Sequence, residues 1–420
     1  MEKKILVTCE CAPNIALVKY WGKKNEDLII PLNSSLSITL DKNVLKTKTS
    51  VMLIKKNKDF SGKDVKIWFD KVLVEFNEAD ENLSDDVINT KRFLRVLNKI
   101  RSNSKLENQR SYAIRICTYN TFPTACGLAS SASGNACMAL ALAHAFDYRD
   151  DISELARLGS GSACRSCYGG FVKWCGTNED KSIAVQVFKS THWQEMNVLI
   201  LVLNDQQKEV SSTKGMKTSV ATSELLKERV KLVESSRIPL VEEAIATKNF
   251  QKLAELIMRD SNQFHAICLD SYPPLFYLNQ KSQEIINIIN AFNNYPTNEL
   301  KAAYSFDAGP NAFIFIQDEY LSEFLQLLRF FYFENLNIET FLKEKFASYL
   351  DFDEKCSLFE ENSDCNEKKV EYFKKFNLNQ SKSNEFIKFI MHSKIGDEPT
   401  ILVHDTFENS LLNTIGEPKG

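Results

Sequence analysis

A run of small side chains at residues 122–134 constrains this chain more than any other feature. The run reads Phe-Pro-Thr-Ala-Cys-Gly-Leu-Ala-Ser-Ser-Ala-Ser-Gly and separates a strand-like stretch at 113–119 from a helical pattern at 131–146. Small residues let a ligand approach the backbone, and a helix N-terminus offers unpaired N–H groups at the positive end of its dipole. This order predicts a phosphate-binding loop, although the Walker A motif is absent. A purely structural, N-capped helix is the alternative.

The length and charge of the chain exclude several classes of protein. A chain of 420 residues exceeds the size at which a single core stops growing, so two packed domains are expected. The net charge of −3 gives no general attraction to nucleic acid or to an anionic membrane. The apolar run at 198–203 is too short to span a bilayer. We therefore expect no nucleic-acid partner and no membrane span.

The cysteines indicate a reducing compartment. There are eleven, an odd number, and they are scattered among small and apolar residues rather than concentrated as in secreted disulfide scaffolds. Cys164 and Cys167 form one C-x-x-C pair, but no second pair follows, and the five histidines have no ligand spacing. We expect reduced cysteines in a cytoplasmic protein, and no protein-held metal cluster.

Local patterns predict an alternation of strands and helices in the first half and mainly amphipathic helices after about residue 190. The strands are expected at 4–12, 36–40, 51–55, 113–119, 183–188, 197–204 and 312–317. The helices are expected at 131–146, from an N-cap at Ser153, and at 224–235, 240–246, 250–259, 280–292 and 320–333. We place the domains at 1–195 and 196–420. A polar stretch at about 335–395 is interpreted as a surface insertion, or alternatively as a partner-binding appendage.

Three further segments carry candidate chemistry. Residues 159–172 surround Arg165 with hydroxyls and glycines, so its guanidinium could bind a carboxylate or phosphate; an exposed loop arginine is the alternative. Asp307 precedes Ala-Gly-Pro and a buried strand, where it could be a general base, a magnesium ligand or simply a turn residue. Residues 11–23 end a strand and contain Lys19, Lys23, Tyr20 and Trp21, which could line a binding site. Alternatively, the two aromatic residues pack in the core and the lysines are exposed to solvent.

Taken together, these segments resemble the diphosphomevalonate decarboxylase family of the GHMP kinase superfamily. The resemblance also includes Asn-Ser-Ser-Leu-Ser at 33–37, Val-Ser-Ser-Thr-Lys-Gly-Met at 210–216 and Arg-Asp-Ser-Asn-Gln-Phe-His-Ala at 259–266, in the order that the family has. Residues 335–395 fall outside it, and it resumes weakly in the C-terminal tail.

The resemblance implies a fold, a reaction and partners. The fold would be α+β, with a ribosomal protein S5 domain 2-like N-terminal domain, an α/β-sandwich C-terminal domain and a deep cleft between them. The reaction would use ATP and Mg²⁺ to convert (R)-5-diphosphomevalonate into isopentenyl diphosphate, ADP, phosphate and CO₂, in the mevalonate pathway of isoprenoid and sterol biosynthesis. The protein would be a homodimer.

The resemblance also implies site residues. The family's catalytic positions fall on Asp307, Arg165, Lys19 and Asn14. Its substrate contacts fall on Tyr20, Trp21, Gly22, Lys23, Ser160, Gly161, Ser162, Ala163, Cys164, Arg165 and Thr213. Its ATP-phosphate contacts fall on Gly127, Leu128, Ala129, Ser130 and Ser131.

The chain departs from the family at a few positions. Cys126 and Cys167 stand where the family usually has Ala and Leu, and neither replacement need disturb a phosphate contact. A further substrate-binding arginine of the family should fall at 89–95, where Asn89, Arg92 and Arg95 compete, so that contact stays unassigned.

The chemistry of the substrate fits these residues. Asp307 would accept or orient the proton of the tertiary hydroxyl as it attacks the γ-phosphate of ATP, and Arg165 would hold the carboxylate. Lys23 and Tyr20 would bind the diphosphate. Two other enzymes remain as alternatives: a superfamily kinase that only phosphorylates, and a decarboxylase acting on the 5-monophosphate. A catalytically inactive binding protein is disfavoured because Asp307, Arg165, Lys19 and the loop serines are all present.

Overall fold

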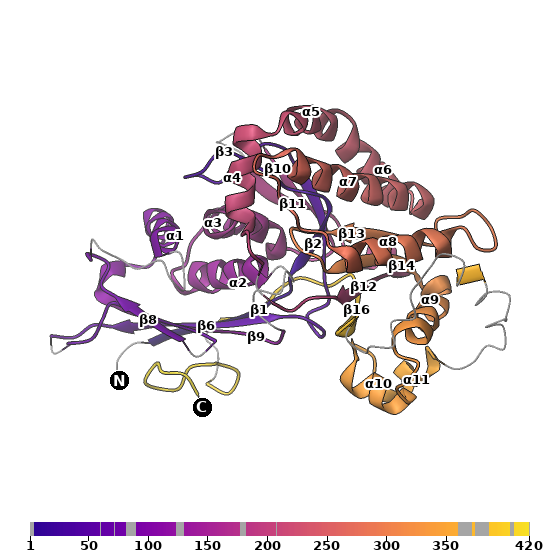
Figure 1. Ribbon diagram of the computed structural model, residues 1–420. Helices are drawn as coiled ribbons and strands as arrows, with labels where there is room; N and C mark the ends of the chain where they lie inside the picture. The colour runs from indigo at the N-terminus through magenta and orange to yellow at the C-terminus, as the bar shows by residue number, and fades with distance from the viewer. Residues whose placement is uncertain are drawn as a thin grey trace.

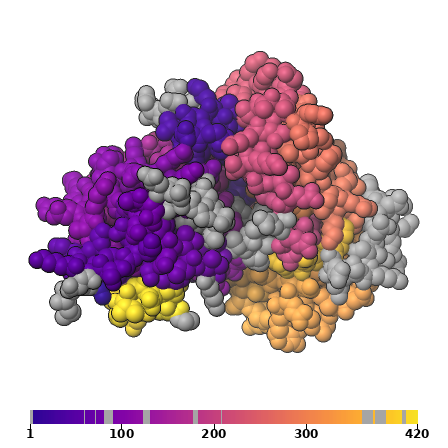
Figure 2. All heavy atoms as spheres, turned by 60° about the vertical axis from the view of Figure 1, so that its left-hand side comes forward, coloured from indigo at the N-terminus to yellow at the C-terminus, as the bar shows by residue number. Residues whose placement is uncertain are grey.

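The computed structural model describes residues 4–58, 60–70, 72–80, 90–122, 130–176, 182–206, 208–359, 372–373, 386–403 and 407–419. Two halves of the chain lie side by side, the first coloured indigo to purple and the second pink to orange (Figures 1 and 2). Within the residues described, none of the helices combines the length and the apolar composition that a membrane crossing requires.

A six-stranded sheet forms the floor of the first half. Its order is β17 (Thr400–Val403), β1 (Lys4–Cys11), β6 (Thr47–Lys55), β9 (Tyr112–Asn120), β7 (Val65–Phe69) and β8 (Val72–Phe76). Alternate side chains of β1 and β6 point to opposite faces, as the pleat of a strand requires. Val7, Val51 and Leu53 pack under the helices, whereas Leu6 and Met52 pack on the other face against the C-terminal residues.

Three helices cover the upper face of this sheet: α1 (Thr90–Ser102), α2 (Ser130–Ala145) and α3 (Ile152–Gly159) (Figure 1). The alanines of α2 allow it to pack closely on β1 and β6, and Thr47 on β6 hydrogen-bonds Ser133 near the start of this helix at 2.7 Å. Asp151, not Ser153, caps α3, because its carboxylate accepts the N–H groups of Ser153 and Glu154. The Ser153 hydroxyl instead accepts the N–H of Ala184 at 2.9 Å.

A second, four-stranded sheet lies at the junction of the two halves. Its order is β11 (Ile183–Phe188), β10 (Phe171–Cys175), β5 (Ser35–Thr39) and β2 (Asn14–Val18), and all its pairs are antiparallel. A two-stranded ribbon, β3 (Lys23–Asn25) and β4 (Ile30–Pro31), follows β2. Because β2 contacts the helix α7 (Phe250–Asp270) of the second half, residues just after β2 can reach both halves.

A five-stranded sheet organises the second half, in the order β13 (Ala302–Phe306), β14 (Ala312–Gln317), β12 (Met196–Val202), β16 (Phe389–Lys394) and β15 (Phe346–Ser348). Both faces of β12 are buried: Val198 and Ile200 point into one apolar cluster, and Leu199 and Leu201 into another. A strand covered on both faces reads as a continuous apolar run, which is why the sequence predicts this one well.

Helices cover both faces of this sheet. Near one face lie α6 (Ile238–Ala246) and α7 (Phe250–Asp270), with α4 (Ser212–Thr222) and α5 (Glu224–Leu232) beside them, and a single π-helical turn at 233–237 joins α5 to α6. The opposite face packs against α8 (Gln280–Asn293), α9 (Asp318–Tyr332) and α10 (Ile338–Glu344), with α11 (Phe352–Ser357) nearby. Figure 1 shows α5, α6 and α7 at the top of the second half and α9, α10 and α11 at its bottom.

The predicted two-domain α+β fold is confirmed, but the 335–395 stretch is not simply a surface insertion. Its last residues include β16, which lies between β12 and β15 in the sheet. Phe341 and Phe373 in the same stretch are fully buried. Predicted helices at 250–259 and 320–333 correspond to the longer α7 and to α9. The division at residue 195 stays a prediction, and the chain end returns to the first half because β17 pairs with β1.

Candidate active site

A cleft of about 600 Å³ lies where the two halves meet. The first half contributes β2 and the segment after it, the N-terminal turn of α2, the helix α1 and the segment 159–165. The second half contributes the loop before α4, the first turns of α4 and the residues after β13. Predicted site residues that line this cleft are Asn14, Lys19, Tyr20, Trp21, Lys23, Ser130, Ser131, Ser160, Gly161, Ser162, Arg165, Thr213 and Asp307.

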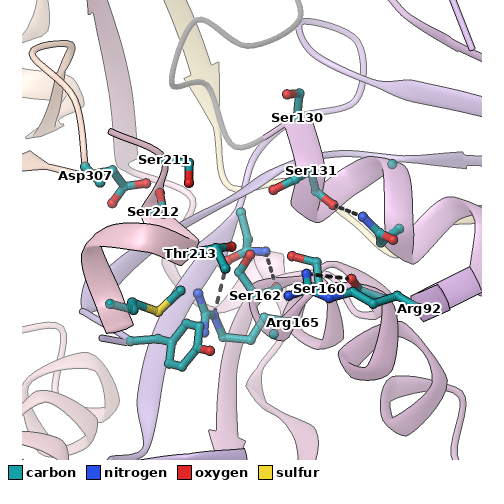
Figure 3. Close-up of a pocket in the computed structure, with 18 of the residues that line it drawn as sticks. Arg92, Ser130, Ser131, Ser160, Ser162, Arg165, Ser211, Ser212, Thr213 and Asp307 are labelled. Atoms are coloured by element: carbon teal, nitrogen blue, oxygen red, sulfur yellow. Dashed lines mark hydrogen bonds between the residues drawn. The ribbon is translucent and has the colours of Figure 1, made fainter. Parts of the chain in front are cut away.

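Lys19 and Asp307 form an ion pair across the junction. The Lys19 Nζ atom lies 2.7 Å from Asp307 Oδ1, although 288 residues separate the two along the chain. The lysine side chain is almost fully buried, at 4% exposed, whereas one third of the aspartate side chain is open to the cleft. Figure 3 shows Asp307 beside Ser211 and Ser212, facing the side of the cleft that holds Ser131. The pair therefore presents a carboxylate, backed by a buried cation, to any ligand in the cleft.

Arg165 is a buried cation held by neutral groups. Its Nε donates to Asn14 Oδ1 at 3.2 Å and to Ser37 Oγ at 3.0 Å, and its Nη1 donates to Ser35 Oγ at 2.5 Å. The residue is 3% exposed, and no carboxylate in the described part of the chain forms a salt bridge with it. Burial lowers the pKa of this guanidinium, which means that the protein interior disfavours its charge. An anion arriving in the cleft would compensate that charge.

Asn14 orients the segment that carries Arg165. Its amide nitrogen donates to the carbonyl of Ser162 at 3.0 Å and to Ser166 Oγ at 2.8 Å, while its amide oxygen accepts from Arg165. The amide thus bridges β2 and the 3₁₀ segment Gly161–Cys167. Ala163 and Cys164 of this segment are fully buried and do not line the cleft.

The aromatic segment after β2 forms another wall. The phenolic group of Tyr20 is buried and has no hydrogen-bond partner in the described residues, and burial raises its pKa. Lys23 lies 2.7 Å from Glu26, and burial lowers the lysine pKa against the opposing effect of that carboxylate. Gly22 does not line the cleft; its φ of +92° allows the turn between Trp21 and Lys23. A partnerless hydroxyl and a partly desolvated ammonium are well suited to bind phosphate oxygens.

The N-terminus of α2 opens into the same cleft. Ser130 and Ser131 begin the helix and line the cavity, and Asn135 donates to the Ser131 carbonyl at 2.8 Å (Figure 3). The preceding loop residues Gly127, Leu128 and Ala129, with Cys126, lie outside the described residues.

The arginine left unassigned at 89–95 has one candidate that lines the cleft. Arg92 on α1 is among the lining residues (Figure 3). Arg95 pairs instead with exposed Asp27 at 2.5 Å, and Asn89 lies outside the described residues. The two arginines differ in their partners: Arg95 is bound to the side chain and the carbonyl of Asp27, whereas Arg92 lines the cleft.

Several lining residues have no counterpart among the predicted contacts. Lys208 donates to Ser212 Oγ at 2.9 Å and to the carbonyl of Ala308 at 3.0 Å, and burial lowers its pKa. Ser211 caps α4, because its hydroxyl accepts the N–H of Lys214. An apolar part of the wall, far from these residues in sequence, consists of Ile67, Phe69, Phe93 and Met138.

The balance of charge favours an anionic ligand with its own cation. Asp307 is the single carboxylate among the described lining residues, against the five cations Lys19, Lys23, Arg92, Arg165 and Lys208. Within the described part of the chain, no three His, Cys, Asp or Glu side chains lie together as a metal site. Mg²⁺ prefers oxygen ligands and commonly binds through one or two carboxylates plus substrate phosphates. Asp307 and the serine hydroxyls fit that arrangement, with phosphates supplying the other ligands.

Comparisons with known proteins agree with this architecture. A diphosphomevalonate decarboxylase from Danio rerio is 43% identical over 343 residues, covering 80% of this chain and 82% of the relative. The mevalonate diphosphate decarboxylase structure from Trypanosoma brucei is 32% identical, with a TM-score of 0.79, and covers 95% of this chain and 98% of that one. A structure of MDDEF in complex with MVAPP, AMPPCP and magnesium is 28% identical, with a TM-score of 0.66, covering 96% and 100%.

Two family models account for most of the chain. The diphosphomevalonate decarboxylase-like N-terminal domain matches residues 11–184, and the mevalonate 5-diphosphate decarboxylase C-terminal domain matches residues 198–402. The second match includes the 335–395 stretch, which sequence motifs alone leave outside the resemblance. On these matches, together with the cleft between its two halves, the chain belongs to the diphosphomevalonate decarboxylase family.

Proposed function

We propose that this chain catalyses the ATP-dependent decarboxylation of (R)-5-diphosphomevalonate to isopentenyl diphosphate, ADP, phosphate and CO₂. The observation that carries the proposal is Arg165, a buried cation with neutral partners at the wall of a cleft that also holds the Lys19–Asp307 pair. A carboxylate of the substrate would supply the missing negative charge, and its planar oxygens match the guanidinium.

The first step would transfer a phosphoryl group to the tertiary hydroxyl. The hydroxyl oxygen forms a bond to the γ-phosphorus, the bond from that phosphorus to the ADP oxygen breaks, and the Asp307 carboxylate takes up or orients the hydroxyl proton. Lys19 holds that carboxylate in place at 2.7 Å. Mg²⁺, when bound with the nucleotide, would neutralise charge on the phosphates.

The second step would release phosphate and CO₂. The C–O bond to the phosphate breaks, the bond between the substrate carbon and its carboxylate breaks, and that electron pair forms the new double bond. Arg165, oriented by Asn14, would keep the carboxylate where its electrons align with the departing phosphate. Ser160 and Ser162 line this part of the cleft beside Arg165 (Figure 3).

The two ends of the substrates would occupy different walls. Tyr20, Lys23 and Arg92 would bind the diphosphate, which does not react. The serines at the start of α2 and the loop before them would bind the ATP phosphates. On the opposite wall, Thr213 would contact the substrate, and Lys208 supplies a further cation. The apolar wall of Ile67, Phe69, Phe93 and Met138 would accept the purine.

Two properties accompany this proposal. We propose a homodimer, which is supported by apolar side chains that are 42–80% exposed where α4, α5 and α7 approach one another: Val220, Leu225, Leu269, Tyr272 and Phe276. We also propose a cytoplasmic location, supported by cysteines that are all free in the described part of the chain. Sedimentation and fractionation would test these two points.

The decisive experiment measures ADP and CO₂ together. Purified protein with Mg²⁺ATP is offered 5-diphosphomevalonate and, separately, the 5-monophosphate. Equal amounts of ADP and CO₂ with the diphosphate alone support the proposal. ADP without CO₂ would indicate a kinase, and turnover of the monophosphate would indicate the other decarboxylase.

The variant Asp307→Asn tests the proposed base. It should keep ATP and substrate binding and lower turnover by about 10²–10⁴-fold, the scale of a lost general base. Thr222→Ala, in the last turn of α4 and outside the cleft lining, serves as a control that should keep full turnover. Near-normal turnover in Asp307→Asn would refute the role given to this carboxylate.

A further inference from the structure

A buried ion pair behind the cleft holds the backbone of Lys19. Asp260 on α7 and Arg229 on α5 are both fully buried, and they form two hydrogen bonds, Nη1 to Oδ1 at 2.9 Å and Nη2 to Oδ2 at 3.0 Å. The Lys19 N–H donates to Asp260 Oδ2 at 2.8 Å, and the Lys19 carbonyl accepts from Arg229 Nη2 at 3.0 Å. Both backbone polar groups of the lysine are therefore bound by one ion pair.

The next residue of α7 holds the other side of the reacting pair. Ser261 follows Asp260, and its Oγ accepts the N–H of Phe306 at 3.0 Å. Phe306 is the last residue of β13 and directly precedes Asp307. Asp260 and Ser261, consecutive on α7, thus hold the backbone at Lys19 and the backbone just before Asp307. The side chains of Lys19 and Asp307 meet at 2.7 Å. Figure 1 shows α7 passing between α5 and the sheet that contains β13.

Stability alone is a weak explanation for this arrangement. A buried ion pair costs desolvation that its attraction barely repays, and well-packed apolar replacements are often neutral or stabilising. Neither Arg229 nor Asp260 lines the cleft, so neither can touch a ligand there. What distinguishes the pair is the directionality of its hydrogen bonds. The carboxylate accepts from the N–H of Lys19 and the guanidinium donates to its carbonyl, so the peptide units before and after Lys19 are both oriented.

We propose that Arg229 and Asp260 are positioning residues that, together with Ser261, fix the Lys19 ammonium against the Asp307 carboxylate. The inference rests on the proposed roles of Lys19 and Asp307 in phosphoryl transfer. A displacement of about 1 Å at a reacting group can cost about 10²-fold in rate without weakening ligand binding. The pair should therefore act on kcat and leave KM nearly unchanged.

The main test replaces both charges at once. The double variant Arg229→Met/Asp260→Leu removes both charges of the pair. Arg237, whose Nη1 lies 3.9 Å from Asp260 Oδ1, keeps its hydrogen bond to the Leu256 carbonyl, so the fold should persist. We expect kcat to fall by about 10–100-fold, with both KM values within about threefold of wild type. Arg101→Met/Glu78→Gln removes a largely buried ion pair outside the cleft and should keep wild-type kcat. A folded double variant with wild-type kcat would overturn the inference.

A milder variant covers the case in which the double replacement unfolds. Ser261→Ala removes only the acceptor for the Phe306 N–H and should lower kcat by about threefold to tenfold at unchanged KM. Arg229→Lys in the intact background should restore part of the activity that Arg229→Met loses, because one donor to the Lys19 carbonyl returns. Unchanged kcat in Ser261→Ala, or equal loss in Arg229→Lys and Arg229→Met, counts against the proposal.

Amide hydrogen exchange gives a readout that does not depend on the reaction. The Lys19 amide should exchange slowly in wild type and at least about tenfold faster in the double variant, since a lost hydrogen bond of about 1.4 kcal/mol corresponds to that factor. Equal exchange in both proteins would overturn the inference. A failure of the proposed function would instead appear as a wild-type protein that does not release CO₂.

Discussion

Two buried histidines should make the stability of this protein fall steeply between pH 7 and pH 5. His265 on α7 is 7% exposed, its Nε2 has no hydrogen-bond partner in the described residues, and it packs against Phe264 and Phe306. Burial and, to a smaller extent, the nearby Lys19 ammonium lower its pKa to about 3, against the opposite effects of a hydrogen bond to the Phe306 backbone and of the Asp307 carboxylate. Burial likewise lowers the pKa of His392, inside the five-stranded sheet, to about 4.

The sign and size of the effect follow from proton uptake. The unfolded chain takes up a proton on each histidine near the ordinary pKa of 6.5, whereas the folded protein does not until the pH is far lower. Stability is therefore complete above about pH 6.5 and is lost as the pH falls. At pH 5 the pH is about 1.5 units below the pKa of each histidine in the unfolded chain. The unfolding free energy is therefore lower by about 2 kcal/mol for each histidine and by about 4 kcal/mol for both.

Urea unfolding at pH 7 and pH 5, followed by tryptophan fluorescence, measures this loss directly. His265→Leu should reduce the pH-dependent loss of unfolding free energy by about 2 kcal/mol, and so should His392→Gln, which keeps groups able to bond Asn197 and Ser348. In the double variant the loss of unfolding free energy between pH 7 and pH 5 should be smaller by about 4 kcal/mol, because the two histidines share none of these partners. If His265→Leu loses as much stability as wild type between these pH values, His265 is not neutral in the folded protein and the reasoning fails.

Three further predictions concern the cleft and the 335–395 stretch. Arg165→Lys should lower kcat/KM for diphosphomevalonate by at least about 10²-fold in steady-state assays, because an ammonium cannot reproduce the fork of hydrogen bonds to Asn14 and the serines; a loss under threefold would contradict it. Tyr20→Phe should change the unfolding free energy by less than about 0.5 kcal/mol while raising KM for the diphosphate about threefold to tenfold, because its hydroxyl has no partner to lose; an unchanged KM would contradict it. Phe341→Ala should cost about 3–5 kcal/mol of unfolding free energy, whereas the exposed Phe352→Ala should cost less than about 0.5 kcal/mol, and equal effects would show that this stretch has no core role.

Elements with a strong local pattern could be predicted from the sequence, and those that depend on distant partners could not. The apolar run of β12 and the small-residue start of α2 contain their own signals, and both are found where expected. The helix α4 carries mostly hydroxyl and Lys side chains, so its period is weak, and its capping by Ser211 becomes clear only with the fold in place. The sequence prediction places the cap of α3 two residues late because Asp151 and Ser153 are both good caps, and only the fold shows that the Ser153 hydroxyl bonds Ala184 instead.

Composition misled the prediction for residues 335–395. Averaged over about sixty residues, the stretch is polar. The average does not show that it contains the short strand β16 and single buried aromatic residues such as Phe341 and Phe373. In β16, Ile390 points into the apolar core while His392 is buried through hydrogen bonds, so the strand shows no clean alternation of apolar and polar residues. A strand that forms the interior of a sheet through pairing with β12, nearly two hundred residues earlier, has no local signature to find.

In the candidate site, too, residues within local motifs could be predicted from the sequence, whereas contacts between distant segments could not. Motif resemblance points to Lys19 and Asp307 separately, because each lies in a recognisable segment, but no spacing rule connects residues 288 positions apart. The contact is created by α7, whose consecutive Asp260 and Ser261 reach back to β2 and forward to β13. In the sequence those two residues belong to the motif at 259–266, to which the resemblance gives no role, and their effect depends on which peptide units the fold brings to them. The residues that touch the substrate can thus be inferred from motifs, whereas the residues that set their separation become visible only as buried partners in three dimensions.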